Sequence, residues 1–176
     1  MRPRKSRASA ADRPPLTPAE ARGLALAWLG QRDLSRAQVR QRLARRGVAA
    51  DTIDALLQDL VARGALDEDR LARAAARRDT AIKGRGPSRT RATLKALGLP
   101  EGTIDAAVTA TYEDVDLEAL LDRALERRLR GLPPGRLEPA AVRRVVGALV
   151  RQGFAPGAVF ARLRRRGAEL PDDPES

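Results

Sequence analysis

One pattern occurs twice in this chain, as GVAADTIDALL at residues 47–57 and as GLPEGTIDAAV at residues 98–108. Each copy has a glycine, an apolar residue, a short polar turn, and then Thr-Ile-Asp-Ala followed by further apolar positions. Self-similarity at a fixed spacing is typical of proteins that are built from tandem repeats. The chain is therefore expected to be an array of similar units.

The spacing of the two copies is the same at both ends of the pattern. Gly98 follows Gly47 by 51 positions, and Thr103 follows Thr52 by the same interval. A looser third copy places Gly153 55 positions after Gly98. One longer loop accounts for this difference, so the sequence predicts three repeats.

The repeated positions are predicted to be structural. Each glycine is expected to end a helix in the left-handed conformation, and the next residue to pack back on that helix. The residue six positions after the glycine falls on the apolar side of the following helix and belongs to the core. The packing residues are Val48, Leu99 and Phe154, and the core residues are Ile53, Ile104 and Val159.

Helical signals fill the chain between its two ends. Ala, Leu, Arg and Glu dominate, β-branched runs are absent, and apolar residues recur three and four positions apart. A unit of three short helices buries little by itself, so neighbouring units have to support one another. The sequence therefore predicts an all-α protein with three tandem three-helix repeats that form an elongated, curved array.

Helix boundaries can be placed from local signals. The segment TPAE at 17–20 combines an N-cap, a first-turn proline and a capping-box partner, and predicts a helix that ends near Gln31. Ser35 is the predicted N-cap of the second helix, and the third begins near 51–52. The acidic turn 67–69 opens a fourth helix. Its expected apolar side consists of Leu71, Ala74, Ala75 and Ile82.

The expected division of the chain follows from these helices. Residues 1–16 are predicted to be a disordered basic tail, because a segment rich in Arg, Pro, Ala and Ser buries little apolar surface. The three repeats are predicted at 17–66, 67–114 and 115–168. Residues 169–176 are predicted to be a short acidic tail.

The charge balance points toward polyanionic partners. The chain has 34 Lys and Arg against 23 Asp and Glu, a net charge of +11. This charge favours nucleic acid as a binding partner and gives no information about the fold. The only aromatic residues are Trp28, Tyr112, Phe154 and Phe160. Proteins that stack bases need more rings, so any contact with nucleic acid is expected to be made to the phosphate backbone.

Several classes of chemistry are excluded by residues that the chain lacks. It contains no Cys and no His, so disulfides, thiolate or imidazole zinc sites and Ser-His-Asp triads are impossible. The acids at 67–69 point in different directions on a helix and are expected to stabilise its N-terminus rather than to bind a metal. No cofactor fingerprint is visible, so we expect no cofactor, no metal and no enzymatic activity.

The sequence also predicts where the protein acts. No apolar run approaches the length of a membrane span, and the charged N-terminus lacks a following apolar segment of a signal peptide. A cytoplasmic monomer without membrane contact is therefore expected.

Three segments carry a resemblance to a known family. They are LALAWLGQRDLSRAQVRQRLARRGV (24–48), LVARGALDEDRLARAAARR (60–78) and KGRGPSRTRATLKALGL (83–99). In this order and spacing the chain resembles the bacterial RecX family, the regulators of the RecA recombinase, strongly over residues 24–112 and weakly over the last third. The resemblance implies tandem three-helix repeats and a protein that binds RecA filaments on single-stranded DNA. Such a protein lies along the helical groove of the RecA filament and restrains filament growth, ATP hydrolysis by RecA and strand exchange.

The densest basic element is KGRGPSRTR at 83–91, which carries Lys83, Arg85, Arg89 and Arg91. Its glycines allow close approach of the backbone, and the amides at the start of the following helix suit a phosphate or a carboxylate. The alternative is a solvated turn that needs glycine and proline only for its geometry.

Other arginines extend the predicted positive surface. The helix at 35–47 is rich in arginine. It could be the recognition helix of a helix-turn-helix, in which arginines read base edges. The alternative is that its arginines form a solvated or phosphate-facing surface. A long cationic track suits either DNA or an acidic groove of a partner. The function alternative to recombinase regulation is therefore non-specific coating of single- or double-stranded DNA through backbone contacts. The further candidate binding residues are Arg40, Arg45, Arg127, Arg128, Arg164 and Arg165.

Overall fold

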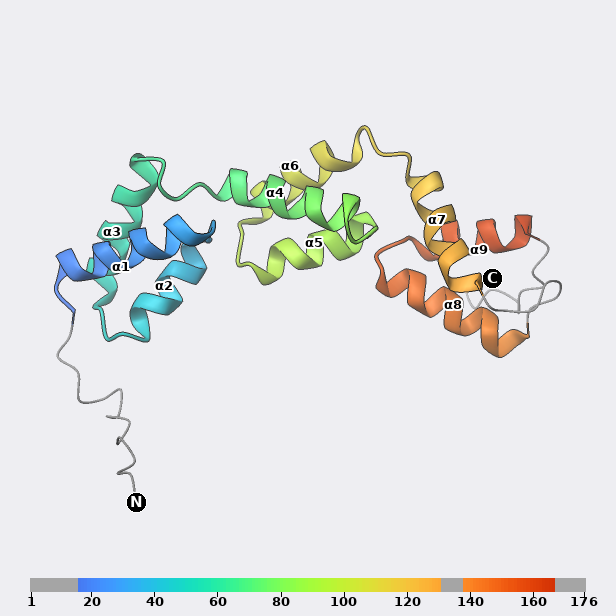
Figure 1. Cartoon of the computed structure of the whole chain (residues 1–176), viewed down its shortest axis with the longest axis horizontal. Coiled ribbons are helices and arrows are strands. Elements are labelled where there is room, and N and C mark those ends of the chain that lie inside the picture. Colours follow the sequence, from blue (N-terminus) through green and yellow to red (C-terminus); the bar gives the residue numbers. More distant parts are fainter. Residues whose placement is uncertain (1–15, 131–137, 167–176) are drawn as a thin grey trace, which may run out of the picture. The chain divides into compact units, whose positions relative to one another are not determined.

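The computed structural model describes residues 16–130 and 138–166, in which the chain forms nine α-helices and no strand. The helices are α1 (Pro18–Gln31), α2 (Arg36–Ala44), α3 (Ala50–Ala62), α4 (Glu68–Ala81), α5 (Pro87–Ala96), α6 (Glu101–Tyr112), α7 (Leu117–Leu129), α8 (Pro139–Arg151) and α9 (Pro156–Arg165). They follow one another along the ribbon as α1–α3, α4–α6 and α7–α9 (Figure 1). The all-α prediction is confirmed. The predicted tails lie outside the described residues, except for Leu16.

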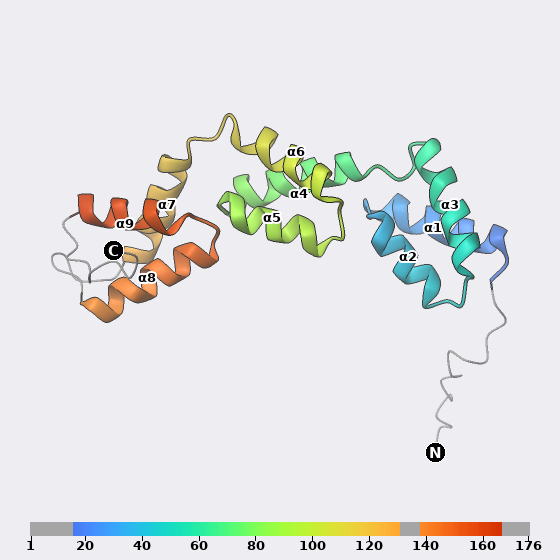
Figure 2. The same ribbon diagram turned by 180° about the vertical axis from the view of Figure 1, so that it is seen from behind.

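The chain divides into two compact units, with the boundary after Leu71, inside α4. In the first unit, α1, α2 and α3 form one group of helices (Figure 2) and contact one another pairwise. They enclose one apolar core. Trp28 on α1 packs against this core, and the guanidinium carbon of Arg42 on α2 lies 5.4 Å from its ring centroid. The largest fully buried side chains of this core are Leu34, Val39, Leu43, Ile53 and Leu60.

The two predicted N-caps are confirmed. The Thr17 hydroxyl accepts the Glu20 amide hydrogen at 3.3 Å, and the Glu20 carboxylate accepts the Thr17 amide hydrogen at 2.9 Å. Ser35 and Gln38 form the same capping box at the start of α2. These reciprocal bonds satisfy amides that have no partner within the helix. The third helix starts slightly before the predicted 51–52, at Ala50, without a side-chain cap.

The repeated glycines end their helices as predicted. Gly47, Gly98 and Gly153 have φ angles of 76°, 74° and 101°, which is the region that disfavours any side chain. The residue after each glycine is buried, and so is the residue six positions after it. The Phe154 amide donates to the Leu149 carbonyl at 3.2 Å, and the Val48 amide makes the equivalent bond. The opening pattern is therefore a helix stop followed by a core contact.

The predicted apolar side of α4 is partly wrong. Leu71 is buried, but Ala74 is exposed and Ile82 is 76% exposed. Ile82 follows the last residue of α4 and therefore lies off the helical stripe. The residues of α4 that are buried are Leu71, Ala72, Ala76, Asp79 and Thr80.

In the second unit, the loop before α5 is attached to the end of α8. The Gly86 amide donates to the Gln152 carbonyl at 2.9 Å, and the Ser88 amide donates to the Gly153 carbonyl at 3.3 Å. A Cβ atom on Gly86 would overlap the Gly153 carbonyl, and one on Gly153 would lie 2.5 Å from the Arg89 nitrogen. We call this backbone contact the Gly86–Gly153 joint. It explains why both positions are glycine.

Candidate functional site

Most of the backbone amides at the start of α5 have partners within the protein. The sequence suggests that they are available to a phosphate, but those of Gly86 and Ser88 are used in the joint, and Pro87 has none. The C-terminal carbonyls of α8 occupy the place of the expected anion, with the favourable helix-dipole arrangement that such an anion would have. The Gly86 and Ser88 amides are therefore not available to an anion near this loop, and side chains are the main donors left.

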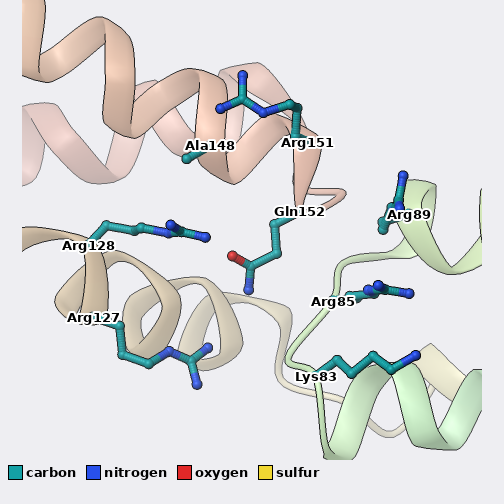
Figure 3. Close-up of a pocket in the computed structure, with 8 residues that line it drawn as sticks. All are labelled: Lys83, Arg85, Arg89, Arg127, Arg128, Ala148, Arg151 and Gln152. Carbon is teal, nitrogen blue, oxygen red and sulfur yellow. The ribbon is translucent and has the colours of Figure 1, made fainter.

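Cationic side chains surround a cleft of about 760 Å³ beside the joint. Lys83, Arg85 and Arg89 come from the α4–α5 segment, while α7 and α8 supply the other cations (Figure 3). The described residues that line it are Lys83, Arg85, Arg89, Arg127, Arg128, Ala148, Arg151 and Gln152. We call this site the cationic cleft. It brings together five of the ten residues predicted from the sequence to bind a partner.

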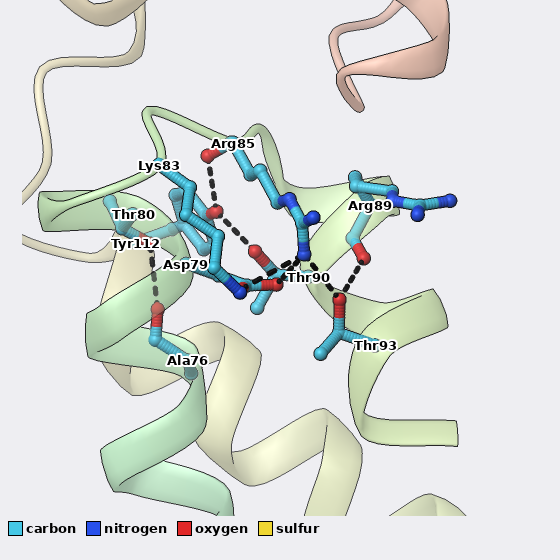
Figure 4. Close-up of polar contacts among 9 residues, drawn as sticks. All are labelled: Ala76, Asp79, Thr80, Lys83, Arg85, Arg89, Thr90, Thr93 and Tyr112. Atoms are coloured by element: carbon cyan, nitrogen blue, oxygen red, sulfur yellow. Dashed lines mark hydrogen bonds and ion pairs between the residues drawn. The ribbon is translucent and has the colours of Figure 1, made fainter. Parts of the chain in front are cut away.

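One wall of the cationic cleft is held by a buried acid. The Asp79 side chain on α4 is 1% exposed, and its carboxylate lies 2.9 Å from Lys83 Nζ and 3.0 Å from Arg85 Nη1 (Figure 4). Arg85 Nη1 also donates to the Thr93 hydroxyl at 3.0 Å. These bonds fix two of the six cations in place, as charge-assisted hydrogen bonds do.

Burial of Asp79 on its own raises the pKa of the carboxyl, because it penalises the charged form. Hydrogen bonds from Thr93, Lys83 and Arg85, with the positive charge of Arg85, outweigh this effect and leave the pKa below its ordinary value. Asp79 is therefore ionised at neutral pH and neutralises part of the wall.

Tyr112 also holds the loop. Its hydroxyl donates to the Arg85 carbonyl at 2.7 Å and lies 2.7 Å from the hydroxyl of buried Thr90 (Figure 4). The end of α6 is thereby connected both to the loop and to α5. The backbone of Arg85 and its side chain are held by different elements, so the position of this guanidinium is well determined.

Four guanidinium groups of the cationic cleft stay available to a ligand. Arg89, Arg127, Arg128 and Arg151 are exposed, and none forms an ion pair with a residue in the described ranges 16–130 and 138–166. Guanidinium groups match the geometry of carboxylates and phosphates and can bind them through two parallel bonds. The cleft is therefore chemically suited to bind an anion.

The other candidate residues lie outside the cationic cleft. Arg91 on α5 forms ion pairs with Glu101 and Asp105 on α6, and Arg40 pairs with Asp54. Arg45 is the exposed C-cap residue of α2. Arg164 and Arg165 are exposed in the last turn of α9.

Sequence reasoning missed Asp79, Arg151 and Gln152. A usable signal existed for Asp79, because it lies seven positions after Ala72 on the buried side of α4, where an acid requires a partner. Gln152 carried no such signal. Its amide reaches the Gly84 carbonyl only because the joint brings these two residues together.

The described part of the chain has neither a cluster of metal ligands nor a membrane-spanning helix. In residues 16–130 and 138–166, no group of three or more His, Cys, Asp or Glu side chains is arranged to hold a metal ion. None of the helices described there is long and apolar enough to cross a membrane.

The solved structures that share this fold include two crystal structures of RecX proteins. The crystal structure of RecX from Lactobacillus salivarius has a TM-score of 0.74 at 15% identity, and the similarity covers 85% of this chain and 96% of that chain. A second crystal structure of a regulatory protein RecX has a TM-score of 0.66 at 21% identity, with 84% and 73% covered. At these identities the similarity establishes the arrangement of helices.

Sequence comparison identifies the family. The family model of the first three-helix domain of RecX matches residues 21–60. The regulatory protein RecX of Halorhodospira halophila is 32% identical over 143 residues, covering 80% of this chain and 84% of the relative. That of Mycolicibacterium vanbaalenii is 32% identical over 145 residues, covering 80% and 79%. This chain therefore belongs to the RecX family of regulatory proteins.

Proposed function

We propose that this protein regulates the RecA recombinase, mainly as a negative regulator. It binds RecA filaments on single-stranded DNA along their helical groove and restrains filament extension, ATP hydrolysis and strand exchange in recombination and repair. It acts in the cytoplasm as a monomer, by binding alone and without a cofactor.

One structural observation supports this proposal beyond membership of the family. The cationic cleft offers four guanidinium groups without ion-pair partners among the described residues. A filament of recombinase on DNA presents both acidic side chains and phosphates, which such groups bind. The cleft is therefore our candidate for the main contact.

Several linked contacts explain a preference for the polymer. With repeats at 17–66, 67–114 and 115–168, one chain carries several binding surfaces that share a single association cost. Arg40 and Arg45 belong to the first of these repeats, and Arg164 and Arg165 to the third. Assembled filaments then bind more tightly than free recombinase subunits.

The second candidate function is coating of DNA without a role for the recombinase. It is favoured by the net charge of +11 and by a cleft whose cations suit phosphates. Binding of this kind weakens steeply as the salt concentration rises. It also requires enough protein to cover the DNA.

The test is RecA ATP hydrolysis on saturating single-stranded DNA, with this protein titrated in at near-physiological salt. Loss of hydrolysis well below one molecule per recombinase subunit supports filament regulation. Loss only at amounts that cover the DNA supports coating, and no effect contradicts both functions.

Comparison of two double variants tests whether the cationic cleft makes the main contact with the filament. Arg127→Gln with Arg128→Gln removes two charges from the cationic cleft. Arg73→Gln with Arg77→Gln removes two exposed charges from α4, outside the cleft lining. We expect the first pair to raise the amount of protein needed for inhibition and the second to change it little. Equal effects would mean that the cleft is not the main contact.

A further inference from the structure

The walls of the cationic cleft are supplied by two separate helix groups. Lys83, Arg85 and Arg89 belong to the α4–α5 segment, whereas Arg127, Arg128 and Arg151 belong to α7 and α8 (Figure 3). The backbone bonds of the Gly86–Gly153 joint bring these groups together. The walls approach closely, because a Cβ atom on Gly84 would lie 2.8 Å from Nη2 of Arg127.

This arrangement carries an electrostatic cost. Six cations face one cleft, and the carboxylate of Asp79 is engaged by only two of them, both on the same wall. Like charges on opposite walls repel each other and oppose closure of the joint. An anion between the walls is attracted by both and removes this opposition.

The lining favours a phosphate over an acidic peptide. Among the described residues that line the cleft, Ala148 is the only apolar one, so this part of the lining offers no pockets of the kind with which peptide side chains are recognised. Two backbone amides at its edge, those of Gly86 and Ser88, are used in the joint. The lining also contains no aromatic ring on which a base could stack. What remains is a set of guanidinium groups, which suits the phosphate itself.

We propose that the cationic cleft binds a phosphate group, and that a bound phosphate strengthens the Gly86–Gly153 joint. The two events are linked, because a ligand that prefers the closed joint stabilises it by the same free energy by which closure strengthens binding. The phosphate comes either from a nucleic-acid backbone or from a free phosphate compound. This property belongs to the isolated chain and does not depend on the recombinase.

The test measures the joint directly in the full-length protein. Backbone amide exchange of Gly86 and Ser88 is followed by NMR with and without pyrophosphate, at constant ionic strength maintained with sodium chloride. Because both amides donate across the joint, we expect bound pyrophosphate to slow their exchange by roughly fivefold or more. A short oligothymidine is titrated in a parallel experiment.

Two variants separate the cleft from general effects of charge. Arg127→Gln with Arg128→Gln alters exposed side chains of α7 and leaves the joint backbone intact, so folding is expected to persist. This variant should lose the effect of both probes on Gly86 and Ser88. Arg73→Gln with Arg77→Gln removes the same charge elsewhere and should retain it.

The outcomes discriminate between sources and can overturn the proposal. Protection by both probes supports a general phosphate site, whereas protection by one alone supports the site and identifies its source. If neither probe protects the two amides, the proposal is overturned. It is also overturned if the Arg127 and Arg128 double variant is protected as strongly as the unaltered protein. None of these results depends on whether the protein inhibits RecA, so failure of either proposal is recognised separately.

Discussion

The side-chain nitrogen of Gln152 lies 2.7 Å from the carbonyl oxygen of Gly84, 68 positions earlier in the chain. With the two backbone bonds of the Gly86–Gly153 joint, this contact attaches the loop before α5 to the end of α8 at three points. The loop that is richest in glycine and positive charge is therefore held by distant residues.

Gly86→Ala is expected to destabilise the protein by about 1–3 kcal/mol, because the new Cβ overlaps the Gly153 carbonyl. Gly102→Ala is the matched control, since nothing lies within 4 Å of a Cβ at that position in α6. It should be neutral or stabilising by up to about 1 kcal/mol. Urea unfolding of both variants gives the comparison. Equal stabilities would show that the joint tolerates a side chain.

Asp79 should make stability depend on pH in the acid range. Its pKa is lower in the folded chain than in the unfolded chain, where it is about 3.9. Its contribution is therefore complete above that value and is lost as the pH falls through the folded pKa. Asp79→Asn should remove this component from a profile of unfolding free energy against pH. An unchanged profile would mean that other carboxyl groups account for the loss of stability at acid pH.

At neutral pH, Asp79→Asn should cost about 1–3 kcal/mol, the range for a buried hydrogen-bonding partner that is lost. The larger cost of a fully buried ion pair is not expected. Lys83 is 39% exposed and can turn toward water when its partner is removed, and Arg85, which is 25% exposed, keeps its bond to Thr93. Thermal or urea unfolding at neutral pH measures this cost, and a loss well above the stated range would show that Lys83 and Arg85 are left with an uncompensated charge.

Tyr112→Phe should cost about 0.5–1.5 kcal/mol, because the Arg85 carbonyl and the Thr90 hydroxyl both lose a partner. Faster exchange of the Gly86 amide should accompany the loss if the loop loosens. Phe154→Leu offers a contrast, because it alters the packing of the α7–α9 core and leaves these hydrogen bonds in place. A stable Tyr112→Phe protein with unchanged exchange would show that Tyr112 does not hold the loop.

Gly47→Ala tests the repeated helix stop. Its φ of 76° disfavours a side chain although nothing lies within 4 Å of a Cβ there, so the expected cost is about 1–2 kcal/mol of backbone strain alone. Gly30→Ala in α1 also has open space, but without a positive φ. Its effect should be neutral or favourable. A comparison of the two unfolding free energies isolates the conformational contribution.

The repeat pattern could be predicted from the sequence because it rests on local chemistry. Capping at Thr17 and Ser35, and the left-handed glycines at 47, 98 and 153, depend on residues within one or two turns. The end of α4 was less predictable. Ile82 looks like part of an apolar stripe, but the helix stops one residue before it and leaves it exposed.

The candidate site was only partly predictable, for a different reason. The basic residues were visible in the sequence, but not which of them have partners. Arg91 faces acids on α6, whereas Arg89, two positions earlier, lines the cationic cleft. Such a difference depends on contacts between elements that are distant in the sequence. For the same reason, the use of α5 amides by the carbonyls of α8 could not be anticipated.

The Gly86–Gly153 joint is made mainly from peptide groups, which every amino acid carries. Apart from Gly86, Gly153 and Gln152, whose side chain donates to the Gly84 carbonyl, residues around it can be exchanged for any residue but proline without removing a hydrogen bond between the two segments. Mutation can therefore change the sign and density of charge on the surrounding surface while the two helix groups keep their attachment. The chain thus combines an interface that tolerates little variation with an adjoining surface on which binding preferences can evolve.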